Sequence, residues 1–227
     1  MGDIEKSTGG ASTSAWPPSV LACGQGCAGL GVKVNPVLAR ATEVRRMSKK
    51  SHPLHLAVAK LFENTLSPDC YLIKDEACGG DQRIPLFASK EKSRKTWYCD
   101  VDLIVLKDDK IKIIVEIEES NLGPTQVCGK YLTSALTRFY IHESNNNEPI
   151  GMNDSVTFIQ IMGCNKLKVD KTSKFEQWQN IEESINQILP VTDSKITKYR
   201  LFYGNISHFK NHEKYRELIN LIKNECK

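Results

Sequence analysis

The stretch Cys99-Asp-Val-Asp-Leu-Ile-Val-Leu-Lys-Asp-Asp-Lys-Ile-Lys-Ile-Ile-Val-Glu-Ile-Glu-Glu-Ser120 decides the fold of this chain. Two runs rich in Ile, Val and Leu flank a short polar centre, a pattern typical of a β-hairpin. Asp102 stands at the start of the first run, and Glu116 and Glu118 stand at the end of the second. Carboxylates cost free energy where apolar strands pack, so three of them at one end indicate a metal site more than a stabilising feature.

The hydrophobic pattern predicts how the two strands pair. A two-residue turn at Asp108-Asp109 would pair Asp102 with Val115 and would leave both faces of the hairpin mixed. A three-residue loop, 108–110, pairs Asp102 with Glu116 and separates the faces cleanly, with one loop residue in a left-handed or bulged conformation. We therefore expect the second register. Its apolar face holds Leu103, Val105, Ile111, Ile113, Val115 and Ile117, and its other face holds Asp102, Ile104, Leu106, Lys112, Ile114, Glu116 and Glu118.

Carboxylates that meet in this way suit Mg²⁺. This hard ion is usually held by one or two carboxylates together with waters and substrate phosphate oxygens. Once bound, it can polarise a phosphate, lower the pKa of a water and stabilise a leaving oxygen. The hairpin therefore indicates phosphate chemistry, and a charged, solvated strand end is the alternative interpretation.

These residues resemble the core of the PD-(D/E)xK phosphodiesterase superfamily, the restriction endonuclease-like fold of type II restriction enzymes and many repair nucleases. In that family an aspartate and the first acid of the next strand bind Mg²⁺ or Mn²⁺, and a lysine two residues later positions or activates water. Asp102 and Glu116 match the first two positions, whereas Glu118 stands at the lysine position and Val101 at the proline position. Some restriction enzymes of the superfamily carry Glu-x-Glu, so the resemblance implies that Asp102, Glu116 and Glu118 are metal-binding and catalytic residues.

The resemblance also assigns two residues outside the hairpin. The family often adds an acid from its first helix, which makes Glu63 a candidate metal ligand, with an exposed helical glutamate as the alternative. On the helix after the second strand, Lys130 could supply the catalytic cation that Glu118 does not. Lys112 shares the predicted face of the carboxylates but lies two residue pairs away from Asp102 and Glu116.

The order of predicted elements is αβββαβαβα, which contains the αβββαβ core of that superfamily over residues 51–163 and a C-terminal αβα extension. The fold class is therefore α/β, with a mixed β-sheet flanked by helices. Apolar spacing predicts helices over 51–66, 124–139, 175–189 and 215–222, and strands over 70–74, 156–162 and 196–203, in addition to the hairpin.

Composition divides the chain into two parts. Residues 1–46 are dominated by Gly, Ser, Thr, Ala and Pro, so we expect a flexible or disordered N-terminal segment. Residues 47–227 are long enough to bury one substantial core and form the predicted nuclease domain. A basic loop precedes the hairpin and is predicted to meet DNA phosphates, with a solvated loop as the alternative; its cations are Lys90, Lys92, Arg94 and Lys95.

Cysteine usage and hydropathy bear on the compartment. The eight cysteines form no CxxC pair, and no histidine pair is spaced to complete a zinc site with Cys23 and Cys27. Reduced cysteines in the cytoplasm are the expectation, and no apolar run approaches the length of a membrane span.

The sequence thus predicts a Mg²⁺-dependent endonuclease that hydrolyses DNA phosphodiester bonds and resembles a type II restriction enzyme, many of which act as homodimers. One alternative is a non-catalytic nucleic-acid- or protein-binding member of the same fold that lost the lysine. The other is an unrelated α/β protein whose acidic hairpin end has no function.

Overall fold

The computed structural model describes residues 52–167 and 172–227. Internal contacts divide the chain between Lys49 and Lys50, and the described residues all belong to the second unit. The segment 1–46, predicted to be flexible, lies outside the described residues. The elements are α2 (Pro53–Thr65), β1 (Cys70–Lys74), β2 (Pro85–Phe87), β3 (Trp97–Asp100), β4 (Leu103–Lys107), β5 (Lys110–Glu118), α3 (Pro124–Ala135), β6 (Phe139–Tyr140), η1 (Glu143–Asn145), β7 (Ile150–Gly163), α4 (Thr172–Gln187), β8 (Ile196–Gly204), α5 (Ile206–Lys210), η2 (His212–Tyr215) and α6 (Arg216–Glu225).

A mixed sheet organises these elements, as the sequence predicts, and it has eight strands rather than the five predicted. The strand order is β1-β4-β5-β7-β6-β2-β3, and β8 pairs with the other side of β7. Strands β1, β4 and β5 pair antiparallel, whereas β5 with β7 and β7 with β8 are parallel. Parallel neighbours need a crossover connection, and the helices α3 and α4 provide the two that are required here.

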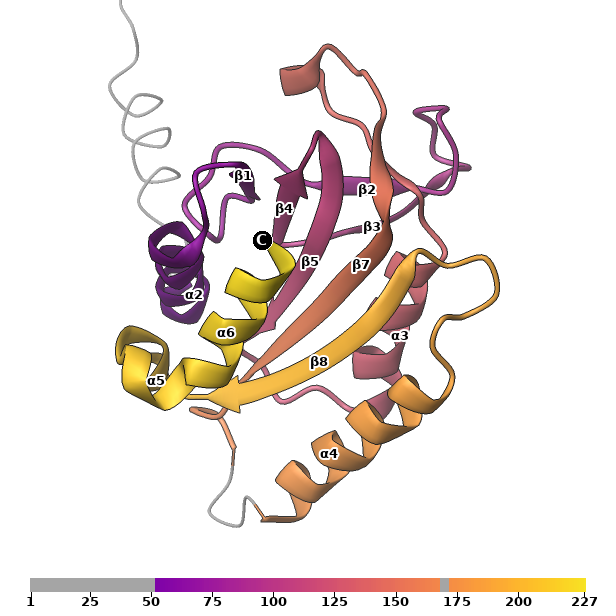
Figure 1. The fold of residues 1–227 in the computed structure, drawn as a ribbon. Helices are drawn as coiled ribbons and strands as arrows, with labels where there is room; N and C mark the ends of the chain where they lie inside the picture. Colours follow the sequence, from indigo (N-terminus) through magenta and orange to yellow (C-terminus); the bar gives the residue numbers. More distant parts are fainter. Residues whose placement is uncertain (1–51, 168–171) are drawn as a thin grey trace, which may run out of the picture. The chain divides into compact units, whose positions relative to one another are not determined.

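Helices cover both faces of the sheet (Figure 1). On one face, α2 and α6 pack against a layer of strand residues that includes Val105, Val115 and Ile161. On the other face, α3 and α4 pack against a layer that includes Ile114 and Phe158. Strand β5 is buried on both faces over 113–117, and these residues are all apolar except Glu116.

The hairpin has the predicted register at its open end but a different turn. Lys107 pairs with Lys110, and the two turn residues Asp108 and Asp109 both have left-handed backbones, with φ of 51° and 56°. A bulge then shifts the pairing so that Val105 faces Ile113. The two-residue turn and the bulge together have the same effect on the register as the predicted three-residue loop.

The bulge corrects two face assignments. Lys112 falls at the register shift, so Ile111 pairs with Leu106 and lies in the α3–α4 core rather than on the predicted apolar face. The amine of Lys112 pairs instead with Glu225 of α6, 3.1 Å away, on the opposite side from Glu116. The pattern alone could not place the bulge, because both faces of this hairpin are apolar.

Several short elements were not predicted, among them β2, β3, β6 and α5. The helix predicted over 124–139 ends at Ala135, and Phe139 begins β6 instead. Leu132 and Leu136 are each 46% exposed, because the buried side of α3 is formed by Val127, Tyr131 and Ala135.

Candidate functional site

The predicted carboxylates lie at one end of the β4–β5 hairpin, beside helix α3. Leu103 faces Val115, and the backbone N–H of Asp102 donates to the carbonyl of Val115 (3.2 Å), so Asp102 stands at the position opposite Glu116. Alternation along β5 puts Glu116 and Glu118 on the side of α3. The amine of Lys130 contacts both glutamates, at 2.8 Å from Glu116 Oε2 and 2.5 Å from Glu118 Oε1.

The site is largely shielded from solvent. The side chain of Glu116 is only 2% exposed, and those of Glu118 and Asp102 are 13% and 17% exposed. The side chain of Lys130 is 37% exposed, so it is the most solvent-accessible of these four side chains. The helix α3 places it there because Val127 and Tyr131 anchor the helix in the core on either side of Lys130.

Asp102 makes two contacts that hold its carboxylate. Its Oδ2 accepts a hydrogen bond from the backbone N–H of Ile117 at 2.6 Å. Its Oδ1 lies 3.8 Å from Nε2 of His55, a buried residue of α2. The oxygens of Asp102, Glu116 and Glu118 are not all within 4.8 Å of one another, since Lys130 bridges the two glutamates and Asp102 is turned toward Ile117. The three carboxylates are neighbours but do not converge as tightly as a shared ion requires.

Burial and mutual repulsion set the electrostatics of this group. Burial raises the pKa of both the Asp102 and the Glu116 carboxyls above their usual values, and the negative charge of Asp102 adds to the effect at Glu116. Burial lowers the pKa of the Lys130 amine, but Glu116 and Glu118 outweigh it and the net shift is upward. Lys130 therefore stays protonated at neutral pH and cannot accept a proton from water.

The donor set fits a divalent cation in charge and in chemistry. Three carboxylates lie beside the ammonium of Lys130, which contacts Glu116 and Glu118, so the group carries an excess of negative charge when all three are ionised. Carboxylate oxygens are also the ligands that Mg²⁺ prefers. Asp102 and Glu116 are the residues that would hold such an ion, with Glu118 beside them.

The structure places the other predicted residues apart from this group. Glu63 lies on α2, as expected, but its carboxylate pairs with Lys74 at 2.6 Å. The first helix instead contributes His55 next to Asp102. The cations of the basic loop, Lys90, Lys92, Arg94 and Lys95, are all exposed between β2 and β3; Lys92 donates to Asn147 (2.6 Å), and Lys90 lies over the ring of Phe139.

Sequence reasoning missed two residues next to the acidic group, His55 and Glu119. Glu119 follows Glu118 directly, so alternation turns its side chain toward α2 rather than α3. There its Oε1 accepts the backbone N–H of Leu54 at 2.9 Å and lies 3.1 Å from Nδ1 of His55. The signal that could have found this contact is the His52-Pro-Leu-His55 spacing at the start of the predicted helix.

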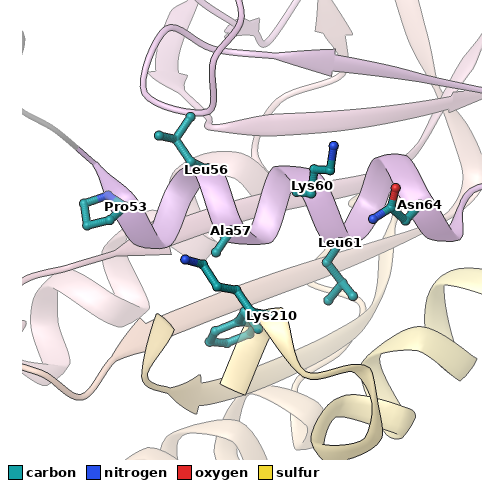
Figure 2. A pocket seen from close by; sticks show the side chains of 8 residues that line it. Pro53, Leu56, Ala57, Lys60, Leu61, Asn64 and Lys210 are labelled. Atoms are coloured by element: carbon teal, nitrogen blue, oxygen red, sulfur yellow. The ribbon is translucent and has the colours of Figure 1, made fainter. Parts of the chain in front are cut away.

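A separate pocket of about 370 Å³ lies between α2 and α5 (Figure 2). In this view Ala57 and Leu61 extend from α2 toward Lys210. The lining contains no carboxylate and no histidine, so this pocket offers no metal ligands. It is formed by Pro53, Leu56, Ala57, Lys60, Leu61, Asn64, Phe209 and Lys210.

The chain matches no protein-family model and no curated protein sequence. Within residues 52–167 and 172–227, no helix is both long enough and apolar enough to cross a membrane. Cys70, Cys78, Cys99, Cys128 and Cys226 are free thiols, whereas Cys23 and Cys27 lie outside the part of the chain that the structure describes.

Proposed function

We propose that this protein is a metal-dependent nuclease of the PD-(D/E)xK type that hydrolyses phosphodiester bonds in DNA with Mg²⁺ or Mn²⁺. The observation that carries the proposal is the placement of Asp102 opposite Glu116 on a hairpin, with Lys130 in contact with Glu116. The topology supports it, because α2, β1, β4, β5, α3 and β7 occur in the order αβββαβ once the short elements β2, β3, β6 and η1 that lie between them are set aside.

Each residue has a role in this proposal. Asp102 and Glu116 hold the ion, which supplies Lewis acidity toward a phosphate oxygen and toward the attacking water. Lys130 takes the place of the lysine that the motif lacks, since its ammonium lies between Glu116 and Glu118. Because it is protonated, it acts on the negative charge that develops on the phosphate, and Glu118 is the group that accepts the proton of the water.

The test is cleavage of supercoiled plasmid DNA with Mg²⁺ or Mn²⁺. We expect Glu116→Gln to lower the cleavage rate by about 100-fold or more, because it removes the charge of a metal ligand without changing its shape. Glu225→Gln is the matched control: Glu225 is also buried and paired with lysines, but on the α6 face of the sheet. Equal rates for the wild type and Glu116→Gln with either metal would refute the proposal.

One observation favours a second candidate, a non-catalytic member of the same fold. Lys130 already neutralises part of the charge on Glu116 and Glu118, so the group can persist as a structural ion pair. This candidate predicts that the protein retains labelled duplex DNA, with an affinity that decreases as the salt concentration rises, and that it does not cleave DNA with any metal. Cleavage by the wild type separates the two: the nuclease cuts DNA and loses this activity in Lys130→Met, whereas the binding module retains DNA without cutting it.

A further inference from the structure

A second set of metal-binding side chains lies between α2 and the end of β5. The ligand atoms of His52, His55 and Glu119 all fall within 4.8 Å of one another. Over the described ranges, 52–167 and 172–227, no other three His, Cys, Asp or Glu residues meet this criterion. These residues take no part in the ion pairs of Lys130, so the group needs an explanation of its own.

Local structure explains why the three residues meet. His52 is the N-cap of α2, and Pro53 follows at the first helical position, where a missing N–H costs nothing. His55 comes three residues after His52, so both imidazoles lie near the same edge of the first turn. Glu119 reaches this turn from the end of β5 and accepts the Leu54 N–H. The carboxylate of Glu119 thus connects the start of α2 to the end of β5.

We propose that His52, His55 and Glu119 bind a transition-metal ion of the Zn²⁺ class. Two imidazole nitrogens with one carboxylate oxygen form a ligand set that suits zinc, whereas Mg²⁺ prefers oxygen ligands alone. Three protein ligands leave the fourth tetrahedral position for a water. The proposal is independent of the nuclease assignment, because none of these residues holds the Mg²⁺ proposed above.

The spacing is close to that of a tetrahedral site. With metal–ligand bonds of about 2.0–2.1 Å, neighbouring donors around zinc lie roughly 3.3 Å apart. His55 Nδ1 and Glu119 Oε1 are 3.1 Å apart, so this pair already has the required separation. The ring of His52 stands edge-on to that of His55, with centroids 5.1 Å apart, and is only half-buried. The ligand nitrogen of His52 lies within 4.8 Å of the ligand atoms of the other two residues.

Asp102 lies near the position of the carboxylate partner that metal-bound histidines usually have. Such a histidine presents its second ring nitrogen to a carboxylate or carbonyl, which fixes the tautomer and the ring orientation. In His55 the nitrogen that faces away from Glu119 is Nε2, and Asp102 Oδ1 lies 3.8 Å from it. The buried His55 thus lies between the proposed zinc ion and Asp102, and the ion would hold the first turn of α2 against the end of β5.

The test compares the full-length chain, without a histidine tag, with His52→Ala. Both proteins are loaded with Zn²⁺, passed through a desalting column and analysed for metal content, and Co²⁺ titrations monitored by visible absorption give the affinities. We expect the wild type to retain one more zinc ion than His52→Ala, and Co²⁺ to bind at this site about 100-fold more tightly in the wild type. His142→Ala is the matched control, since His142 is the N-cap of η1 and is not in the group.

Two further variants keep the result interpretable. Glu119→Gln retains an acceptor for the Leu54 N–H but weakens the ligand, so it should lose the zinc ion even if His52→Ala does not fold. Glu116→Gln removes a proposed Mg²⁺ ligand and should keep the zinc ion, which separates this proposal from the nuclease assignment. Equal zinc content and equal Co²⁺ affinity in the wild type, His52→Ala and Glu119→Gln would overturn the proposal and would assign any bound zinc to other groups, such as the thiols.

Discussion

Two buried glutamates of this protein show how neighbours decide the behaviour of one residue type. Glu116 is 2% exposed and Glu225 is 6% exposed, and both contact lysines. Burial raises the pKa of Glu116, and the nearby charge of Asp102 raises it further. Burial also acts to raise the pKa of Glu225, but Lys198 and Lys112 outweigh it and the net shift is downward. The anionic form of Glu225 is thus stabilised, whereas that of Glu116 is destabilised, as is common for carboxyls in functional sites.

This difference predicts a pH dependence for Glu225. A carboxyl whose pKa is lower in the folded state contributes stability that is complete above its unfolded pKa of about 4.3 and is lost as the pH falls through the folded value. Glu225→Gln should therefore lower the free energy of unfolding by about 1–3 kcal/mol at pH 7. The difference from the wild type should shrink below about pH 4.3. Urea unfolding at several pH values measures it, and a difference that stays constant down to pH 3 would contradict the assignment.

At the residue scale, the sequence predicted the positions of the carboxylates better than it predicted which residues contact them. The hydrophobic pattern placed Asp102 opposite Glu116, because register follows from which side chains can be buried. Lys130 came from a resemblance, and the structure brings it to both glutamates. The His52-Pro-Leu-His55 spacing could have marked His55 as a candidate, but its position near Asp102 depends on how α2 crosses the hairpin, which local spacing does not encode.

The β4–β5 hairpin is the element on which the candidate site depends. Its turn holds Asp108 and Asp109 with φ of 51° and 56°, a conformation that strains residues with a Cβ atom and favours Asn-Gly. The bulge at Lys112 then restores the register that places Asp102 opposite Glu116. The sequence predicted this register but not the turn, since a bulge and a longer loop satisfy the same hydrophobic pattern.

The strained turn predicts a stabilising substitution. Replacing Asp108-Asp109 with Asn-Gly should raise the free energy of unfolding by about 1 kcal/mol, because glycine adopts the left-handed conformation without the cost that a Cβ atom brings. Asp109→Val is the opposite control and should destabilise the protein, since a β-branched residue is disfavoured at positive φ. Thermal unfolding followed by circular dichroism tests both, and equal melting temperatures for the two variants would show that the turn is not strained.

At the scale of the whole molecule, the long elements were predictable and the short ones were not. Helices α2, α4 and α6 and strands β1, β7 and β8 carry apolar spacing over enough residues to reveal their type. Strands β2, β3 and β6 have four residues or fewer and exist because they pair with one another and with the first part of β7. Such pairing is a tertiary property, so the sequence predicted the five-stranded part of the sheet and missed its extension.

The two cores on opposite faces share strands β5 and β7, and this arrangement predicts a single cooperative unfolding transition. Leu218 of α6 is fully buried on one face, and Trp178 of α4 is fully buried on the other. Leu218→Ala should lower the free energy of unfolding by about 2–5 kcal/mol, because it removes buried methyl groups and leaves a cavity. Since both faces pack on the same strands, the loss should be seen through Trp178 as fully as through the backbone.

Far-ultraviolet circular dichroism reports the backbone. In a background that carries both Trp16→Phe and Trp97→Phe, Trp178 is the remaining tryptophan, so tryptophan fluorescence reports Trp178. The two probes should give the same urea midpoint in the wild type and the same shift in Leu218→Ala. Leu132→Ala is the matched control, since this helical leucine is 46% exposed and should change the free energy of unfolding by less than about 1 kcal/mol. If Leu218→Ala shifted only the circular dichroism midpoint, the two faces would unfold independently, and the shared strands would not couple the α6 core to the face that carries Glu116 and Lys130.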